Sequence, residues 1–144
     1  MGPSFPPRFL PLSGFVSIWI NISEIFRYFV IVMPAMRKYL TMVPGVAPMN
    51  LPVFLIWGLW DTLLTMAIVF ISWLCANWYG KSRKAIFIAG TTCWATFFLL
   101  FWIAMVNMHL SSTSILIYTL PLSWLETTVA AWMTIRFCAI KAIE

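Results

Sequence analysis

The amino-acid sequence predicts an all-α membrane protein, a four-helix transmembrane bundle with both termini in the cytoplasm. Of the 144 residues, 62% are hydrophobic and only 9% are charged, which leaves too little polar surface to cover a water-soluble globule. Four windows are mostly apolar over about the 20 residues that a helix needs to cross a bilayer. Basic residues gather beside alternate ends of these windows, in the pattern of the positive-inside bias.

The four apolar windows make up one transmembrane domain that takes in residues 1–144. None of them alternates between apolar and polar residues as a barrel strand would, so helices are the expected spanning form. The predicted spans are about 15–33, 51–73, 85–106 and 114–135. Their even number agrees with termini that lie on the same side of the membrane.

The first window is the weakest of the four as a span. Its polar residues Ser17, Asn21, Glu24 and Tyr28 recur at helical spacing along one stripe. This pattern fits either a span whose polar stripe faces the protein interior or an amphipathic helix that lies in the interface. We favour the span, because moving the N-terminus outside would weaken the charge bias.

Proline-rich segments lie on both sides of the first window. Pro34 is predicted to end the helix, and two further prolines and a glycine follow in AMRKYLTMVPGVAPMN. We therefore expect an external loop over residues 34–50, with one short interfacial turn. The N-terminal stretch MGPSFPPRFLPLSG has no apolar core that leads to a cleavage site, so we expect no signal peptide.

Positive charges orient the predicted bundle. Arg37 and Lys38 fall on one side of the membrane, and the larger group falls on the other: Arg8, Lys81, Arg83, Lys84, Arg136 and Lys141. This excess predicts cytoplasmic termini, and we expect the bacterial inner (cytoplasmic) membrane as the location. The net charge of +5 then reflects topology and contact with anionic headgroups, so membrane lipid is an expected partner and nucleic acid is not.

Asp61 lies in the stretch WGLWDT and is the only charged residue of the second span. A rise of about 1.5 Å per residue places it roughly 15 Å inside that span, near the bilayer midplane. Glu126 and Glu24 fall at a similar depth in the fourth and first spans, and Arg27 follows Glu24 by one turn. Three carboxylates and one guanidinium are therefore expected to converge on one slab of the membrane.

These charges must pair or become neutral, because a charge at the bilayer centre is costly. One interpretation is structural: Arg27 bridges Glu24 at i,i+3 and also reaches Asp61 or Glu126, joining the helices. One arginine cannot neutralise three acids, so at least one carboxyl remains as a proton donor or as a counter-charge for a cation. The candidates for catalysis, proton transfer or ligand charge pairing are Asp61, Glu126, Glu24 and Arg27.

Several tryptophans lie near the depth of the acids, although tryptophan in membranes usually collects at the interfaces. Tryptophan faces beside carboxylates suit an apolar or cationic organic ligand, through burial and cation–π attraction. Ordinary packing explains any one of them, but the combination is more specific than any member. The predicted ligand-binding residues are Trp57, Trp60, Trp94, Trp124, Asn21 and Thr65, whereas Trp102 is expected to mark the outer interface.

Common catalytic motifs are missing from the sequence. It contains no Gly-rich phosphate loop, no HExxH or paired Cys/His set, and no GxSxG nucleophile. The cysteines Cys75, Cys93 and Cys138 have no CxxC spacing, and we interpret them as small packing residues. We therefore expect no metal and no cofactor.

Three functions fit these observations. The first is a protein that binds or transports a small apolar or cationic organic molecule, with Asp61 and Glu126 exchanging a proton or cation for it; four helices are few for a pathway, so a homo-oligomer is expected. The second is an intramembrane acid–base enzyme of the isomerase, cyclase or epoxide hydrolase type that acts on a lipophilic substrate. The third is an accessory subunit of a membrane complex, in which the charges serve assembly.

Overall fold

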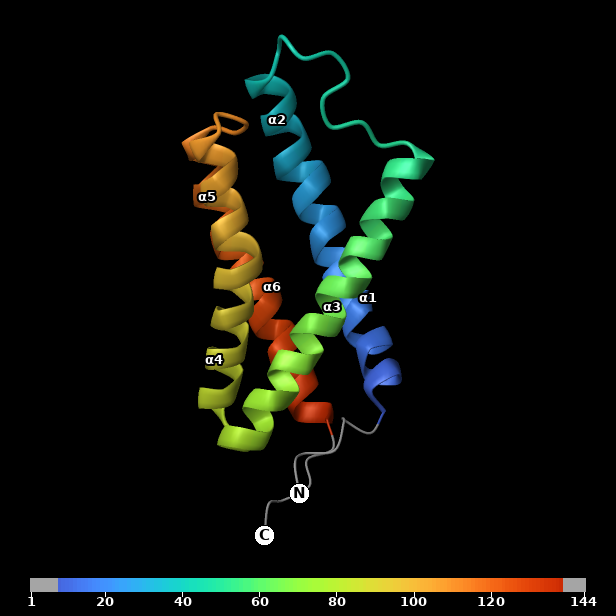
Figure 1. Ribbon diagram of the computed structural model, residues 1–144, viewed down its shortest axis with the longest axis vertical. Helices are drawn as coiled ribbons and strands as arrows, with labels where there is room; N and C mark the ends of the chain where they lie inside the picture. Colours follow the sequence, from blue (N-terminus) through green and yellow to red (C-terminus); the bar gives the residue numbers. More distant parts are fainter. Residues whose placement is uncertain (1–7, 139–144) are drawn as a thin grey trace.

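A computed structural model describes residues 8–138, and all regular structure in that range is helical. Four long helical rods fold against one another (Figure 1). The prediction of an all-helical chain with four helices is therefore confirmed for this range. Residues 1–7 of the proline-rich N-terminal stretch lie outside the described residues, as does Lys141 of the predicted cytoplasmic charge.

The first rod continues past Pro34, so the predicted end of the helix at this residue is wrong. α1 (Phe9–Arg27) runs through a π-helical turn, η1 (Tyr28–Val32), into α2 (Met33–Tyr39). The N–H of the residue before the proline donates to a carbonyl five residues back, not four. This wider turn accommodates the proline ring, which would clash with the preceding turn of a regular α-helix. The segment between the first two rods, predicted as an external loop over residues 34–50, is correspondingly shorter than predicted and begins at Leu40.

The remaining three rods follow in chain order. The second is the uninterrupted helix α3 (Leu51–Tyr79). The third resembles the first, because α4 (Arg83–Trp94) runs through a second π-helical turn, η2 (Ala95–Leu99), into α5 (Leu100–Asn107). The fourth rod is α6 (Leu116–Phe137).

Three of the rods are long and apolar enough to cross a membrane: Phe9–Tyr39, Leu51–Tyr79 and Arg83–Asn107. The shortest has 25 residues, more than the roughly 20 that a bilayer requires. These rods mark the chain as an integral membrane protein. α6 is less apolar because its buried face carries polar side chains: Thr119, Ser123, Glu126, Thr127 and Thr134.

α6 packs against all three other rods, and α3 also packs against α1 and α4. The start of α1, the turn between α3 and α4, and the end of α6 lie at one end of the molecule (Figure 1). At that end the Lys81 ammonium donates to the Arg136 carbonyl at 3.2 Å. Arg37 and Lys38 lie in the last turn of α2, at the opposite end. Within the described range, the basic residues are thus divided between the two ends as the sequence predicts.

The rods are packed most tightly in the half of the molecule that contains the α3–α4 turn. Ile20, Ile68 and Ala130 are fully buried there and join α1, α3 and α6. α4 and α6 approach closely at Gly90, where an added Cβ would lie 2.7 Å from the Cα of Thr128. Only a glycine permits this separation of the two backbones.

The opposite half is more open. No residue of α3 is buried before Asp61, although the residues that follow are buried at helical spacing. α3 diverges from α5 in this half (Figure 1). Asp61 therefore marks the level at which α3 enters the packed part of the bundle.

Candidate functional site

Arg27 connects two helices at the centre of the molecule. Its Nη2 forms an ion pair with Oε1 of Glu24, one turn earlier on α1. Its Nη1 donates to Oε2 of Glu126 on α6 at 3.1 Å. The guanidinium also lies over the ring of Phe98, 4.6 Å from its centroid. Both partners of Arg27 are thus acids that the sequence predicts to lie near the same depth in the membrane as Arg27.

Glu126 is fully buried and only partly satisfied. Its Oε2 accepts a second hydrogen bond, from the Ser23 hydroxyl at 2.6 Å, and its backbone carbonyl accepts from the Trp19 indole at 3.0 Å. Its Oε1 has no hydrogen-bond partner among the described residues. A buried polar atom without a partner is uncommon in proteins, so Glu126 is a specific feature of this site.

Asp61 is the carboxyl with which Arg27 forms no ion pair in the described part of the chain. It is 6% exposed, and its carboxyl group makes neither a hydrogen bond nor an ion pair within residues 8–138. Its backbone carbonyl accepts from the Thr65 hydroxyl at 2.7 Å. The charges of Glu24 and Arg27 both act on it electrostatically. The central cluster therefore contains two paired acids and one unpaired acid.

A cavity of about 450 Å³ lies next to this cluster, between the first rod, the N-terminal half of α3, and η2–α5. Most of its wall is aromatic or aliphatic: Tyr28, Val32, Met36, Ile56, Trp57, Trp60, Leu64, Phe97, Phe98, Phe101, Trp102 and Met105. The charged lining residues are Glu24 and Arg27. Tyr28 and Trp57 meet edge to face across it, with ring centroids 4.3 Å apart. The arrangement is a largely apolar pocket with an ion pair in its wall, and it is open to the surface, since Ile56, Trp60 and Phe101 are each more than half exposed.

The structure divides the tryptophans that the sequence grouped together. Trp57 and Trp60 line the cavity. Trp94 instead donates to the Leu120 carbonyl at 2.9 Å, and Trp124 donates to the Thr91 hydroxyl at 3.1 Å. These two bonds join the third rod to α6, so the side chains serve packing between helices.

The two small polar residues of the predicted site also lie outside the cavity lining. The Asn21 amide donates to the Ser17 carbonyl, one turn earlier on α1, at 2.8 Å. Thr65 is buried and bonds the carbonyl of Asp61. Both side chains satisfy the backbone of their own helix, as such residues commonly do inside bundles.

Sequence reasoning missed most of the third-rod wall. Trp102 was expected at the outer interface, but it is buried and lines the cavity. Phe97, Phe98 and Phe101 accompany it on the same rod. Nothing in the sequence distinguishes these positions, because the lipid-facing residues of this rod are equally apolar.

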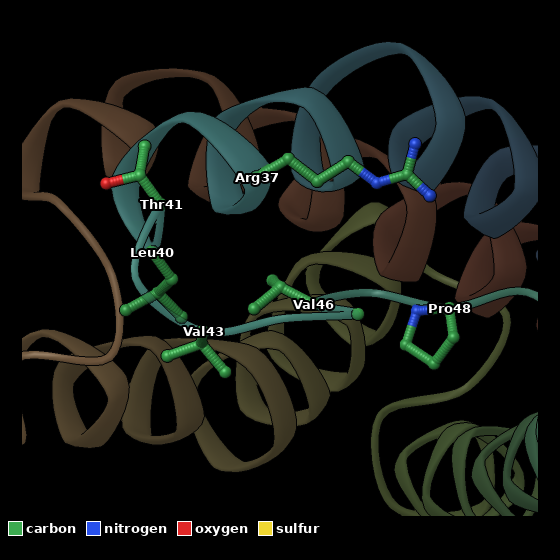
Figure 2. Close-up of a pocket in the computed structure, with 7 residues that line it drawn as sticks. Arg37, Leu40, Thr41, Val43, Val46 and Pro48 are labelled. Atoms are coloured by element: carbon green, nitrogen blue, oxygen red, sulfur yellow. The ribbon is translucent and has the colours of Figure 1, made fainter.

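A second hollow, of about 400 Å³, is formed by the end of α2 and the segment that follows it (Figure 2). Arg37, Leu40, Thr41, Val43, Gly45, Val46 and Pro48 line it. The Arg37 guanidinium donates to the Ala47 carbonyl at 3.3 Å, and the Tyr28 hydroxyl donates to the same oxygen at 3.2 Å. These bonds hold the segment against the first rod. We therefore interpret the hollow as a result of how the segment packs, and not as a separate binding site.

No family model, curated protein or solved structure matches the chain. The chemistry that the site can support therefore follows from its own side chains. An aromatic chamber can hold an apolar or cationic molecule, the Arg27 pairs can hold two helices together, and an unpaired buried carboxyl can carry a proton or face a cation.

Proposed function

We propose that the protein binds a small organic molecule with an apolar or aromatic body in the central cavity and carries it across the membrane. The observation that supports this is the aromatic wall contributed by three rods around one chamber. Its volume of about 450 Å³ is within the range of small-molecule sites, and such sites combine apolar walls with a few polar groups. The Glu24–Arg27 pair supplies those polar groups.

The proposal includes an orientation and a setting. α6 would be the fourth span, since its polar buried face is covered by the other three rods. Both termini would be cytoplasmic, because the end with Lys81, Arg83 and Arg136 carries more positive charge than the end with Arg37. We expect the protein in the bacterial inner membrane. We also expect a homo-oligomer, because four helices are few to enclose a transport pathway.

The enzyme and the accessory subunit gain no specific support. An intramembrane acid–base enzyme needs a free acid that reaches its substrate, but of the three central acids only Glu24 lines the cavity, and it is paired with Arg27. An assembly role for the charges would leave them available to another chain, whereas both acids paired with Arg27 belong to this one.

The test is binding of an aromatic probe, neopentylbenzene, to the purified protein in detergent, measured by isothermal titration calorimetry. Trp57→Ala should weaken binding by roughly 1–3 kcal/mol, as is typical of a buried aromatic contact. Trp78→Phe is the matched control, because Trp78 is 83% exposed at the far end of α3. Equal losses in both variants would contradict the proposal, as would failure of the unmodified protein to bind both neopentylbenzene and an aromatic cation of the same shape.

A further inference from the structure

The charges of the central cluster do not balance. Arg27 supplies one positive charge, and its guanidinium is committed to Glu24 and Glu126. Asp61 is buried and makes no ion pair in the described part of the chain. An unpaired carboxylate is unfavourable at this depth, so the site must either hold a proton on Asp61 or receive a positive charge from elsewhere.

Asp61 is not among the residues that line the cavity, but it adjoins α3 residues that are. Trp57 precedes it by four residues and Leu64 follows it by three, so all three lie on one face of α3. Both of these neighbours line the cavity, as does the adjacent Trp60. A positive group at the cluster end of the cavity would therefore lie beside the face that carries Asp61.

The walls suit such a group. Trp57, Trp60 and Trp102 belong to the residue type that attracts cations most strongly through its ring face. Desolvation strengthens this attraction, and the cavity is lined mostly by apolar side chains. One cation is already held this way in the same cavity, because the Arg27 guanidinium lies over Phe98.

We propose that the ligand of this cavity is an organic cation with an aromatic or apolar body, and that it binds beside Asp61 in exchange for one proton. The inference rests on the proposed function, since it names the ligand class of the same cavity. The exchange is balanced: the Asp61 O–H bond breaks, the proton leaves to water, and the carboxylate forms an ion pair with the cation. The cluster keeps the same net charge in both states, which suits its position in the membrane.

Other ionisable groups face Asp61 from the helices packed against α3. α1 presents Glu24 and Arg27, which pair with each other, and α6 presents Glu126, which is fully buried behind Ser23 and Arg27. The third rod has no charged residue after Lys84, and its only ionisable side chain beyond that point is the Cys93 thiol. η1 adds the Tyr28 hydroxyl, which is bonded to Ala47. Asp61 is the acid that has no other partner.

The test compares benzyltrimethylammonium with neopentylbenzene, which have the same shape but differ by one charge. The quaternary ammonium cannot titrate, so any pH dependence belongs to the protein. Calorimetry in two buffers of different ionisation enthalpy counts the protons released. The unmodified protein should release about one proton per cation, and its affinity for the cation should rise by about tenfold per pH unit while the empty site is protonated. Neopentylbenzene should release none.

Asp61→Asn keeps the side-chain shape but removes the charge. It should abolish proton release and weaken cation binding by about tenfold or more, while the affinity for neopentylbenzene stays the same. Thr62→Ala, at the neighbouring exposed position of α3, is the control and should change neither. If Asp61→Asn does not fold, the proton count on the unmodified protein still decides.

The outcomes separate the two proposals. Cation binding without proton release, or equal cation affinity in Asp61→Asn, would overturn the exchange at Asp61 but leave the binding cavity in place. A preference for neopentylbenzene over the cation would overturn the ligand class in the same way. Failure of both probes to bind would overturn the proposed function as well.

Discussion

The contact between Arg27 and Glu126 should be the main polar connection between α1 and α6. Arg27→Gln removes the cation from two ion pairs and leaves two carboxyls facing one another. Breaking a buried pair by removing one partner costs about 3–5 kcal/mol of the free energy of unfolding. Glu126→Gln should cost less, about 1.5–3 kcal/mol, because the amide oxygen still accepts from Ser23 and Arg27 still has Glu24.

The double variant Arg27→Gln/Glu126→Gln leaves no buried charge on either side of the contact. Its loss of stability should therefore be smaller than the sum of the two single losses, by at least about 1 kcal/mol. The measurement is the free energy of unfolding of the detergent-solubilised protein, obtained by denaturant titration. It does not depend on ligand binding at the site. The control cycle pairs Arg27→Gln with Arg136→Gln, which lies at the end of α6. Additivity within about 0.5 kcal/mol for Arg27 and Glu126 would refute the reasoning.

Two further predictions concern packing and topology. Gly90→Ala should destabilise the protein by about 1–3 kcal/mol, because the new Cβ would meet the backbone of Thr128 at 2.7 Å; Gly58→Ala meets nothing within 4 Å and should stabilise α3 by up to about 1 kcal/mol in the same unfolding assay. Similar effects at both glycines would show that α4 and α6 are not in close contact. Cysteines introduced at Thr41 and Ser82, with the native cysteines replaced, should react with an impermeant thiol reagent from opposite sides of the membrane, and labelling from one side would exclude the proposed topology.

The sequence predicts those features of the structure that depend on the length of an apolar run or on the depth of a residue within its span. The rods follow from runs of apolar residues that exceed the thickness of a bilayer. The bridge between Glu24 and Arg27 follows from helical spacing, because residues three apart face each other on any helix. That one arginine cannot neutralise all three acids follows from counting alone.

The rotation of each helix was not predictable. Trp57 and Trp94 have similar composition around them, but one lines the cavity and the other bonds α6. Helices in lipid gain nothing from turning an apolar face inward, since the lipid is equally apolar. Hydrophobic periodicity therefore does not tell which tryptophan faces the protein, and the burial of Trp102 was not predicted for the same reason.

The predicted end of the first helix was wrong for a local reason. Proline normally breaks a helix because it removes one backbone donor and crowds the preceding turn. The π-helical turn before Pro34 relieves that crowding, and no residue type in YFVIV announces it.

The first π-helical turn also determines which side chains can share the cavity. Glu24, Tyr28, Val32 and Met36 line it at steps of four residues. Each such step overshoots a full α-helical turn by about 40°, so three steps would carry Met36 about 120° out of line. The extra residue in η1 takes back about 100° of this drift. Deleting one residue from this turn would therefore rotate the whole outer helix away from the chamber, so this wall is more vulnerable to a change of chain length than to a change of side chain.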